Sequence, residues 1–154
     1  MSYITGMVTT RVDASTDQQW ALGTIGQDSS GYLYKYVKYD TGGDGVTAVA
    51  ANAVYYHGVD GYKDNEVTMD LSDSVNLGAG ILLSVPGNGE FCWIQLTGPA
   101  TMAQAPTAGA DGNALTAVGA DADGKLDVSG AVTECVVAYA GDISDNEIIC
   151  AFPL

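Results

Sequence analysis

The chain is short of basic residues. It has 19 Asp and Glu residues against five Lys and Arg residues, which gives a formal net charge of −14. Residues 64–154 hold 13 of the acids and only one base. Nucleic-acid affinity comes largely from Lys and Arg side chains that displace counterions from phosphates. The charge therefore argues against nucleic acid and anionic membranes as partners, and it favours solubility.

Histidine and paired cysteines are also scarce. The one histidine, His57, lies in a stretch of ordinary turn residues, so no Ser-His-Asp triad is indicated. Cys92, Cys135 and Cys150 lie in separate apolar runs, and their odd number excludes a complete disulfide framework. We expect three buried free thiols. A zinc site normally needs several His or Cys ligands, so we predict no metal, no cofactor and no enzymatic activity.

Long apolar runs are missing as well. No stretch approaches the roughly 20 residues of a membrane-spanning helix. Residues 1–3 begin neither a basic segment nor an apolar segment of the signal-peptide type. We therefore expect synthesis in a cytoplasm.

The residues that are present predict an all-β protein. Apolar residues make up 47% of the chain, enough for a packed core, and 20 glycines punctuate it at short intervals. Residues 46–57 are ambiguous, because their alanines allow a helix while their β-branched and aromatic residues favour a strand. Many short strands between turns predict a small antiparallel barrel or sandwich. The expected strands are residues 20–26, 31–39, 66–71, 80–85, 90–96, 114–118, 124–128, 135–140 and 147–152, with 46–57 as the uncertain addition.

Two regions differ in composition. Residues 1–18 are rich in Thr, Ser and Asp, and we interpret them as an extended N-terminal arm. Residues 19–154 are then a single β domain, with a possible loose subdivision near residues 86–89, where Pro, Gly and Asn interrupt the pattern.

The clearest strand is residues 31–39. Successive side chains of a strand point to opposite faces, so one face carries Tyr32, Tyr34 and Tyr36, and the other carries Leu33, Lys35, Val37 and Tyr39. We interpret the tyrosines as an interface whose hydroxyls reach water. A stacking surface for sugars is the alternative.

One acidic segment has a partial likeness to a calcium loop. Residues 121–127 contain three aspartates and a glycine, but the first carboxylate and the final bidentate glutamate of an EF-hand loop are missing. We therefore predict a hairpin turn at residues 121–124, because Asp-Gly suits the positive φ angles of such turns.

The order of several motifs resembles the small head decoration (cement) proteins of tailed bacteriophages. An aromatic strand with Trp-Ile-Gln is followed by an Ala- and Gly-rich stretch, a Gly-x-x-Leu strand, an Asp-Gly-x-Leu hairpin and two closing strands. Residues 22–24 and 34–38 are similar to the N-terminal part of such proteins. The later matching segments are residues 89–98, 112–115, 123–126, 136–140 and 148–152.

The resemblance implies a β-barrel without an active site that binds the outer surface of a phage head. It also implies a homotrimer that stabilises the lattice of the major capsid protein, with the virion exterior as its final location. A carbohydrate- or receptor-binding accessory module of the virion is the alternative. From the residues themselves, we predict as interface residues Tyr3, Ile4, Met7, Val8, Arg11, Trp20, Tyr32, Tyr34 and Tyr36.

Overall fold

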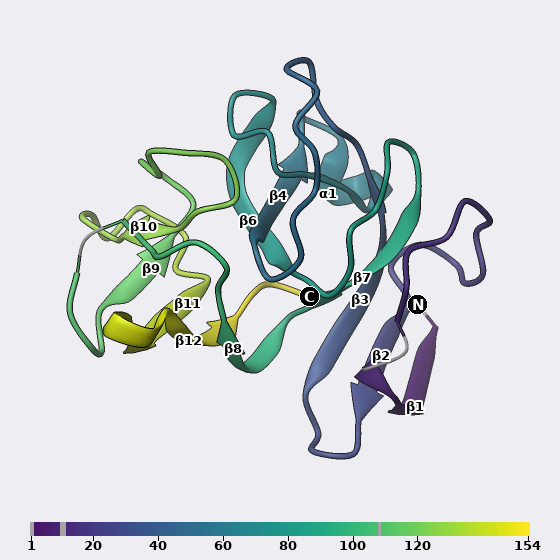
Figure 1. Cartoon of the computed structure of the whole chain (residues 1–154), viewed down its shortest axis with the longest axis horizontal. Coiled ribbons are helices and arrows are strands. Elements are labelled where there is room, and N and C mark those ends of the chain that lie inside the picture. Colours follow the sequence, from purple (N-terminus) through teal and green to yellow (C-terminus); the bar gives the residue numbers. More distant parts are fainter. Residues whose placement is uncertain (1, 10–11, 108) are drawn as a thin grey trace.

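The protein is built almost wholly of β-strands (Figure 1). The computed structural model describes residues 2–9, 12–107 and 109–154. The helical pieces include the one-turn α1 (Gly61–Asp64) and the 3₁₀ turn η2 (Ile143–Asp145). Among the described residues, no helix has the length and apolar character needed to cross a membrane.

The first sheet closes on itself. Its strands follow the order β3-β5-β4-β6-β7, and β7 pairs again with β3 over a register from Tyr34↔Gln95 to Lys38↔Phe91. The β3–β5 pairing is parallel and the other pairings of this ring are antiparallel. Closure leaves these strands without a long free edge. The ring consists of β3 (Leu33–Tyr39), β5 (Glu66–Thr68), β4 (Ala53–His57), β6 (Ser74–Leu82) and β7 (Phe91–Gln95).

Two further strands extend this sheet beyond β3. β2 (Ile25–Asp28) pairs antiparallel with the first half of β3, through a turn at residues 28–31. Gly31 adopts a φ of 87°, which suits glycine, and its N–H donates to the Asp28 carbonyl oxygen. β1 (Tyr3–Met7) pairs in parallel with β2 and forms the edge of the sheet.

The second sheet is wholly antiparallel and lies beside the first in a sandwich-like arrangement (Figure 1). The chain passes from the first sheet to the second at Leu96. Its N–H donates to Leu33 in β3, and its carbonyl oxygen accepts from Phe152 just after β12. In spatial order the strands are β10 (Asp127–Val128), β9 (Ala114–Thr116), β11 (Ala138–Asp142), β12 (Glu147–Ala151) and β8 (Thr97–Thr101).

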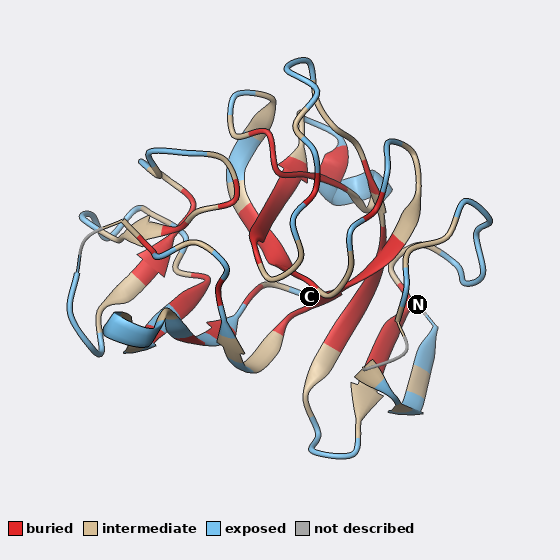
Figure 2. Cartoon of the chain, viewed as in Figure 1, coloured by how far each residue is buried: buried red, intermediate tan, exposed pale blue. Residues whose placement is uncertain are grey.

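One apolar cluster draws on both sheets. Tyr39 and Ile94 come from the first sheet, Leu115 and Ile148 from the second, and each is at most 1% exposed. Figure 2 shows the buried residues concentrated along the strands, with the loops exposed. The interior phenols have polar partners, since Tyr39 donates to the Val46 carbonyl oxygen at 2.8 Å. Burial of such aromatic residues is the main stabilising contribution to a core of this kind.

The all-β prediction is confirmed, although several bounds differ. The ambiguous segment 46–57 forms a loop and then β4, because buried β-branched and aromatic residues at Ala53–His57 fit a sheet better than a helix. The strand expected at residues 20–26 begins only at Ile25. β8, Thr97–Thr101, was not predicted, since TGPAT has no alternating pattern. Residues 86–89 join β6 to β7 within the first sheet.

Candidate functional site

The described part of residues 1–18 packs on the domain. β1 pairs with β2, and Ser15 forms a β-bridge with Phe91 at the start of β7. The Tyr3 hydroxyl donates to Gln27 Oε1 at 2.6 Å. Whether this segment acts as an arm in an assembly stays a prediction. Arg11, one of the predicted interface residues, lies outside the described residues.

This segment borders an open apolar groove of about 270 Å³ beside β3 and β7. The structure brings together five of the predicted interface residues there: Ile4, Met7, Val8, Trp20 and Tyr36. Trp93, Val12, Asp13, Ser15 and Gln19 complete its lining. Gly26 makes the arrangement possible, because a Cβ at that position would collide with the Met7 sulfur and lie against the Trp93 ring.

Tyr34 and Tyr36 share one face of β3, as predicted, but other side chains bury that face. Tyr34 and Tyr36 are only 4% and 3% exposed and form a second apolar cluster with Trp93. The rings of Tyr36 and Trp93 lie 5.1 Å apart between centroids. Tyr32, less buried, packs at the margin of the same cluster. The expectation that these hydroxyls face water is therefore wrong for Tyr34 and Tyr36.

Both buried hydroxyls have protein partners. The Tyr34 hydroxyl donates to Asp28 Oδ2 at 2.9 Å, and the Tyr36 hydroxyl accepts from the Gln19 N–H at 3.1 Å. Burial, together with the neighbouring Asp28 carboxylate, raises the pKa of Tyr34. The side chains that remain free to meet a partner are instead Tyr3, Val8 and Trp20, which are 54%, 57% and 44% exposed.

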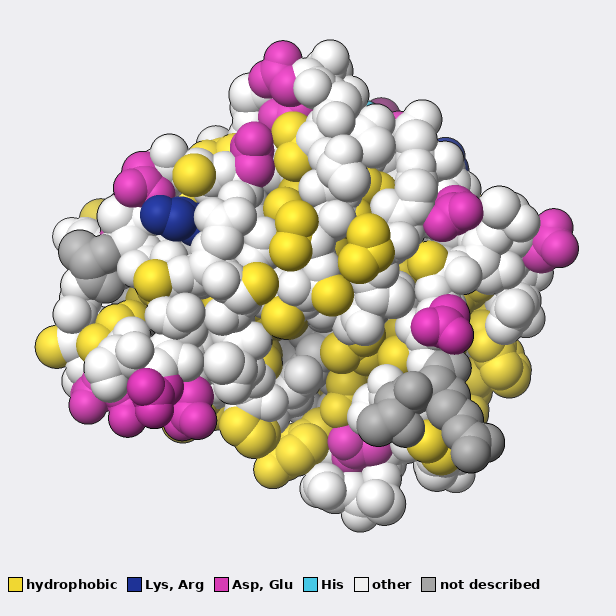
Figure 3. Space-filling view, in the orientation of Figure 1, with side chains coloured by type: hydrophobic (Ala, Val, Ile, Leu, Met, Phe, Trp, Pro, Cys, Tyr) yellow, Lys and Arg dark blue, Asp and Glu magenta, His cyan; other side chains and the backbone are white. Residues whose placement is uncertain are grey.

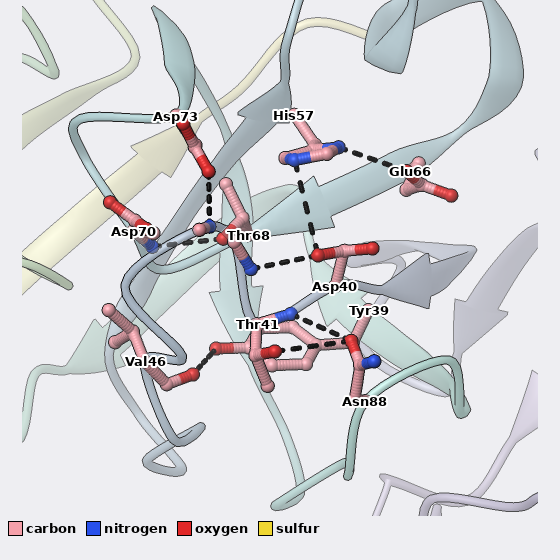
Figure 4. A network of polar contacts seen from close by, with 12 residues as sticks. Tyr39, Asp40, Thr41, Val46, His57, Glu66, Thr68, Asp70, Asp73 and Asn88 are labelled. Carbon is pink, nitrogen blue, oxygen red and sulfur yellow. Dashed lines mark hydrogen bonds and ion pairs between the residues drawn. The ribbon is translucent and has the colours of Figure 1, made fainter.

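His57 takes part in a polar network at the ends of three strands (Figure 4). Its Nδ1 lies 2.9 Å from Glu66 Oε1, and its Nε2 lies 4.0 Å from Asp40 Oδ1. Glu66 Oε2 in turn accepts a hydrogen bond from Lys38 Nζ at 2.9 Å.

Asp40, His57 and Glu66 could together offer a metal ion one nitrogen and two oxygens. However, Lys38 already holds one Glu66 oxygen, and Asp40 Oδ1 accepts the Gly42 N–H at 2.8 Å. We therefore interpret the group as an ion-pair network that joins β3, β4 and β5, with His57 at the end of β4.

The segment with a partial likeness to a calcium loop is a turn. Its strands β9 and β10 pair antiparallel, and Gly124 has a φ of 75°. Asp121 Oδ1 accepts from Thr107 Oγ1 and lies 3.2 Å from Lys125 Nζ. The Lys125 N–H donates to the Ala122 carbonyl oxygen at 3.3 Å, so a turn is present, but residues 117–126 join β9 to β10 in a longer loop than the predicted hairpin turn at residues 121–124.

The cysteines divide into two kinds. Cys92 and Cys150 are buried, and burial raises the pKa of each thiol to about 12. Cys135 is exposed, which corrects the expectation of three buried thiols. The run that contains Cys135 is apolar in sequence, but it precedes β11 in a loop and not in a strand.

We expect a thiol reagent to modify one cysteine per folded chain. The thiolate is the nucleophile, and the buried, raised-pKa thiols of Cys92 and Cys150 are both inaccessible and protonated at pH 8. Titration with a chromogenic disulfide should give one fast equivalent, and three after denaturation. A Cys135→Ser variant should lose the fast equivalent, and its persistence would contradict the assignment.

Sequence analysis missed an apolar row on the outer face of the second sheet. Tyr139, Ile149 and Pro99 face one another across β11, β12 and β8, and all three are exposed. Tyr139 is 46% exposed and Ile149 is 52% exposed. A strand was predicted at residues 147–152, but both of its faces carry apolar side chains, so the sequence did not indicate that the face with Ile149 is the exposed one.

Comparisons with family models, with curated proteins and with solved structures find no match for this chain.

Proposed function

We propose that this protein is a capsid decoration subunit, which binds the outer surface of a phage head and stabilises the lattice of the major capsid protein. The proposal rests on β1, which forms an open edge of the first sheet. Among the described residues, β1 pairs with a strand on one side only, and exposed apolar side chains lie on it or near it at Tyr3, Val8 and Trp20. An edge strand offers unpaired N–H and C=O groups to a strand of another chain.

The physical basis is repetition. A small edge contact is weak by itself, but many copies held on one lattice, and joined to each other as trimers, bind with a high effective concentration. The acidic surface counters non-specific self-association and favours a partner surface that is neutral or basic. Figure 3 shows acidic side chains at several places on one face, with few basic ones between them.

The test is reconstitution on purified phage heads that lack the protein. Deletion of residues 2–17 should abolish most of the occupancy and the gain in heat resistance of the heads. Because this deletion removes β1 and uncovers Tyr36 and Trp93, a paired substitution, Val8→Asp with Trp20→Asp, changes only exposed side chains and should keep the fold.

The matched control is Val59→Asp, which is 92% exposed and lies next to α1, away from β1. It should load as well as the unaltered protein. If the deletion and the Val8/Trp20 variant both load fully and protect the heads equally, the N-terminal edge has no part in attachment.

The same groove favours a second candidate, a carbohydrate-binding accessory module. Trp20, Tyr36 and Trp93 bring aromatic rings next to the polar side chains of Asp13 and Gln19, which is a combination that sugar sites use. Saturable binding on a glycan array that Trp20→Ala removes would favour this function. A glycan array without any signal at high protein concentration would rule out the carbohydrate-binding function.

A further inference from the structure

Lys35 is a cation placed in an apolar interior. It lies on β3 between register partners Ile25 and Ile94, on the same face as Val37 and Tyr39. The residue is only 4% exposed. A buried ammonium group is costly unless a carboxylate or several hydrogen bonds compensate it.

The compensation around Lys35 is incomplete. Its Nζ donates to the Tyr56 hydroxyl at 3.0 Å and lies 5.5 Å from the Tyr56 ring centroid and 5.6 Å from that of Tyr62. These contacts contribute cation–π attraction. No carboxylate of the described residues comes within ion-pair distance of it, and burial lowers the pKa of Lys35.

Lys35 is one of the residues that line an open pocket of about 330 Å³, together with Tyr62, whose ring lies 5.6 Å from the Lys35 Nζ. Lys63 and Asn65 also line it, together with Leu22, Gly23 and Leu154. None of these side chains is acidic, although the chain has 19 Asp and Glu residues. The Asn65 side-chain amide makes no hydrogen bond to the described residues, so its donors are free for a ligand.

The lysines outside this pocket form ion pairs with carboxylates, whereas the two lysines that line it do not. Lys38 pairs with Glu66 at 2.9 Å and Lys125 pairs with Asp121 at 3.2 Å. Among the described basic residues, Lys35 and Lys63 are the two that have no carboxylate partner, and both line the same pocket. The main-chain carboxylate of Leu154 also lines the pocket, where its oxygen accepts from the Tyr62 hydroxyl at 3.2 Å, but neither lysine pairs with it. Two ammonium groups against one carboxylate leave a local surplus of positive charge in a chain of net charge −14.

We propose that this pocket binds a small monoanionic carboxylate with an apolar body. The carboxylate lies between the ammonium groups of Lys35 and Lys63 and accepts from the Asn65 amide, while the body packs against Leu22 and the Tyr62 ring. A monoanion fits better than a dianion, because the desolvation cost of an ion rises steeply with its charge and Lys35 alone is buried. The anion replaces the counterion that Lys35 lacks, and at short range inside the pocket salt screens the attraction only in part.

The experiment is calorimetric titration of the isolated protein at low ionic strength. Benzoate and hexanoate are the probes, benzamide is the neutral isostere, and inorganic phosphate at pH 8, where it is mostly doubly charged, is the dianion. Saturable carboxylate binding, with benzamide and phosphate each at least about tenfold weaker, is the expected result. Absence of saturation by either carboxylate, or a preference for phosphate, would overturn the proposal.

Three variants locate the site. Lys35→Met and Lys63→Met should each weaken benzoate at least about tenfold, whereas Lys125→Met, which removes a lysine already paired with Asp121, should leave binding unchanged. If the Lys35→Met variant does not fold, the Lys63→Met variant still tests the site, because Lys63 is exposed. Benzoate that binds equally to the Lys63 variant and the unaltered protein would remove the pocket from consideration. The assay uses no phage heads, so its outcome is separate from that of the decoration proposal.

Discussion

Replacement of Asp70 by alanine is expected to lower the free energy of unfolding by about 3–4 kcal/mol. Asp70 is fully buried. Its carboxylate accepts from the Ser72 hydroxyl at 2.7 Å, from the Ser72 N–H at 3.0 Å and from the Asp44 N–H at 3.1 Å. It thereby ties the loop after β3, which contains Asp44, to the loop after β5. Without it, the partly buried Ser72 and Asp44 donors lose their charged acceptor and the two loops lose this link.

The control for this substitution is Asp17→Ala. Asp17 is exposed and its side chain makes no hydrogen bond to the described residues, so the change should cost less than about 0.5 kcal/mol. Urea denaturation followed by tryptophan fluorescence measures both variants. Equal midpoints for the two would contradict the role assigned to Asp70.

The same carboxylate predicts a pH dependence. Burial by itself raises the pKa of Asp70, but the hydrogen bonds from Ser72, Asp44 and Asp73 outweigh burial and leave the pKa below its usual value. A carboxyl group whose pKa is lower in the folded state adds stability above its unfolded pKa of about 3.9. That stability is lost as the pH falls through the folded pKa.

Asp70→Asn isolates this effect, since it removes the charge with little change in volume. The stability difference between the unaltered protein and this variant should be constant from pH 5 to pH 7 and shrink as the pH falls below about 4. A difference that stays the same down to the acid end of the titration would show that the ionised form of Asp70 is not what stabilises the fold.

The second large effect is expected at Gly98. This residue of β8 lies just after the crossing between the sheets and has a φ of 89°. A Cβ there would collide with the Tyr32 ring. Gly98→Ala should therefore lower the free energy of unfolding by about 3 kcal/mol, because it strains the left-handed backbone and also displaces the Tyr32 ring.

Gly45→Ala separates the two contributions. Gly45 has a φ of 67°, but no heavy atom lies within 4 Å of the position that a Cβ would take. The Gly45→Ala substitution should lower the free energy of unfolding only through the left-handed backbone, by about 1 kcal/mol. The double variant Gly98→Ala with Tyr32→Ala should then show a favourable coupling energy. Equal losses for Gly98→Ala and Gly45→Ala would mean that the Tyr32 contact imposes no strain.

Local patterns were enough for some parts of the fold. The alternating faces of β3 and the turn near Gly124 depend on residues close in sequence, and both are present, although this turn lies in a longer loop than predicted. The bounds of β2 and β8 were not predictable in the same way. Pairing with distant strands decides them, and a strand such as β8 has no pattern of its own.

For the candidate sites, the sequence indicated single residues but not which other residues lie next to them in the fold. It put Lys35 on a face with Leu33 and Val37, which is already unusual for a lysine, but gave no sign that Lys63 and Asn65 would meet it. It likewise grouped Ile4, Met7 and Val8 with Trp20 as interface residues, without showing that they border one groove with Trp93.

The sequence alone determined the all-β class, the acidic surface and the separation of side chains onto two faces of each strand. These follow from composition and from a two-residue period, which are local properties. Only the tertiary structure decided which face is covered: β1 and Trp93 enclose Tyr36, while β3 and β7 close the barrel around Lys35. The reason is that strand pairing joins residues far apart in the chain, and no local pattern specifies the partner.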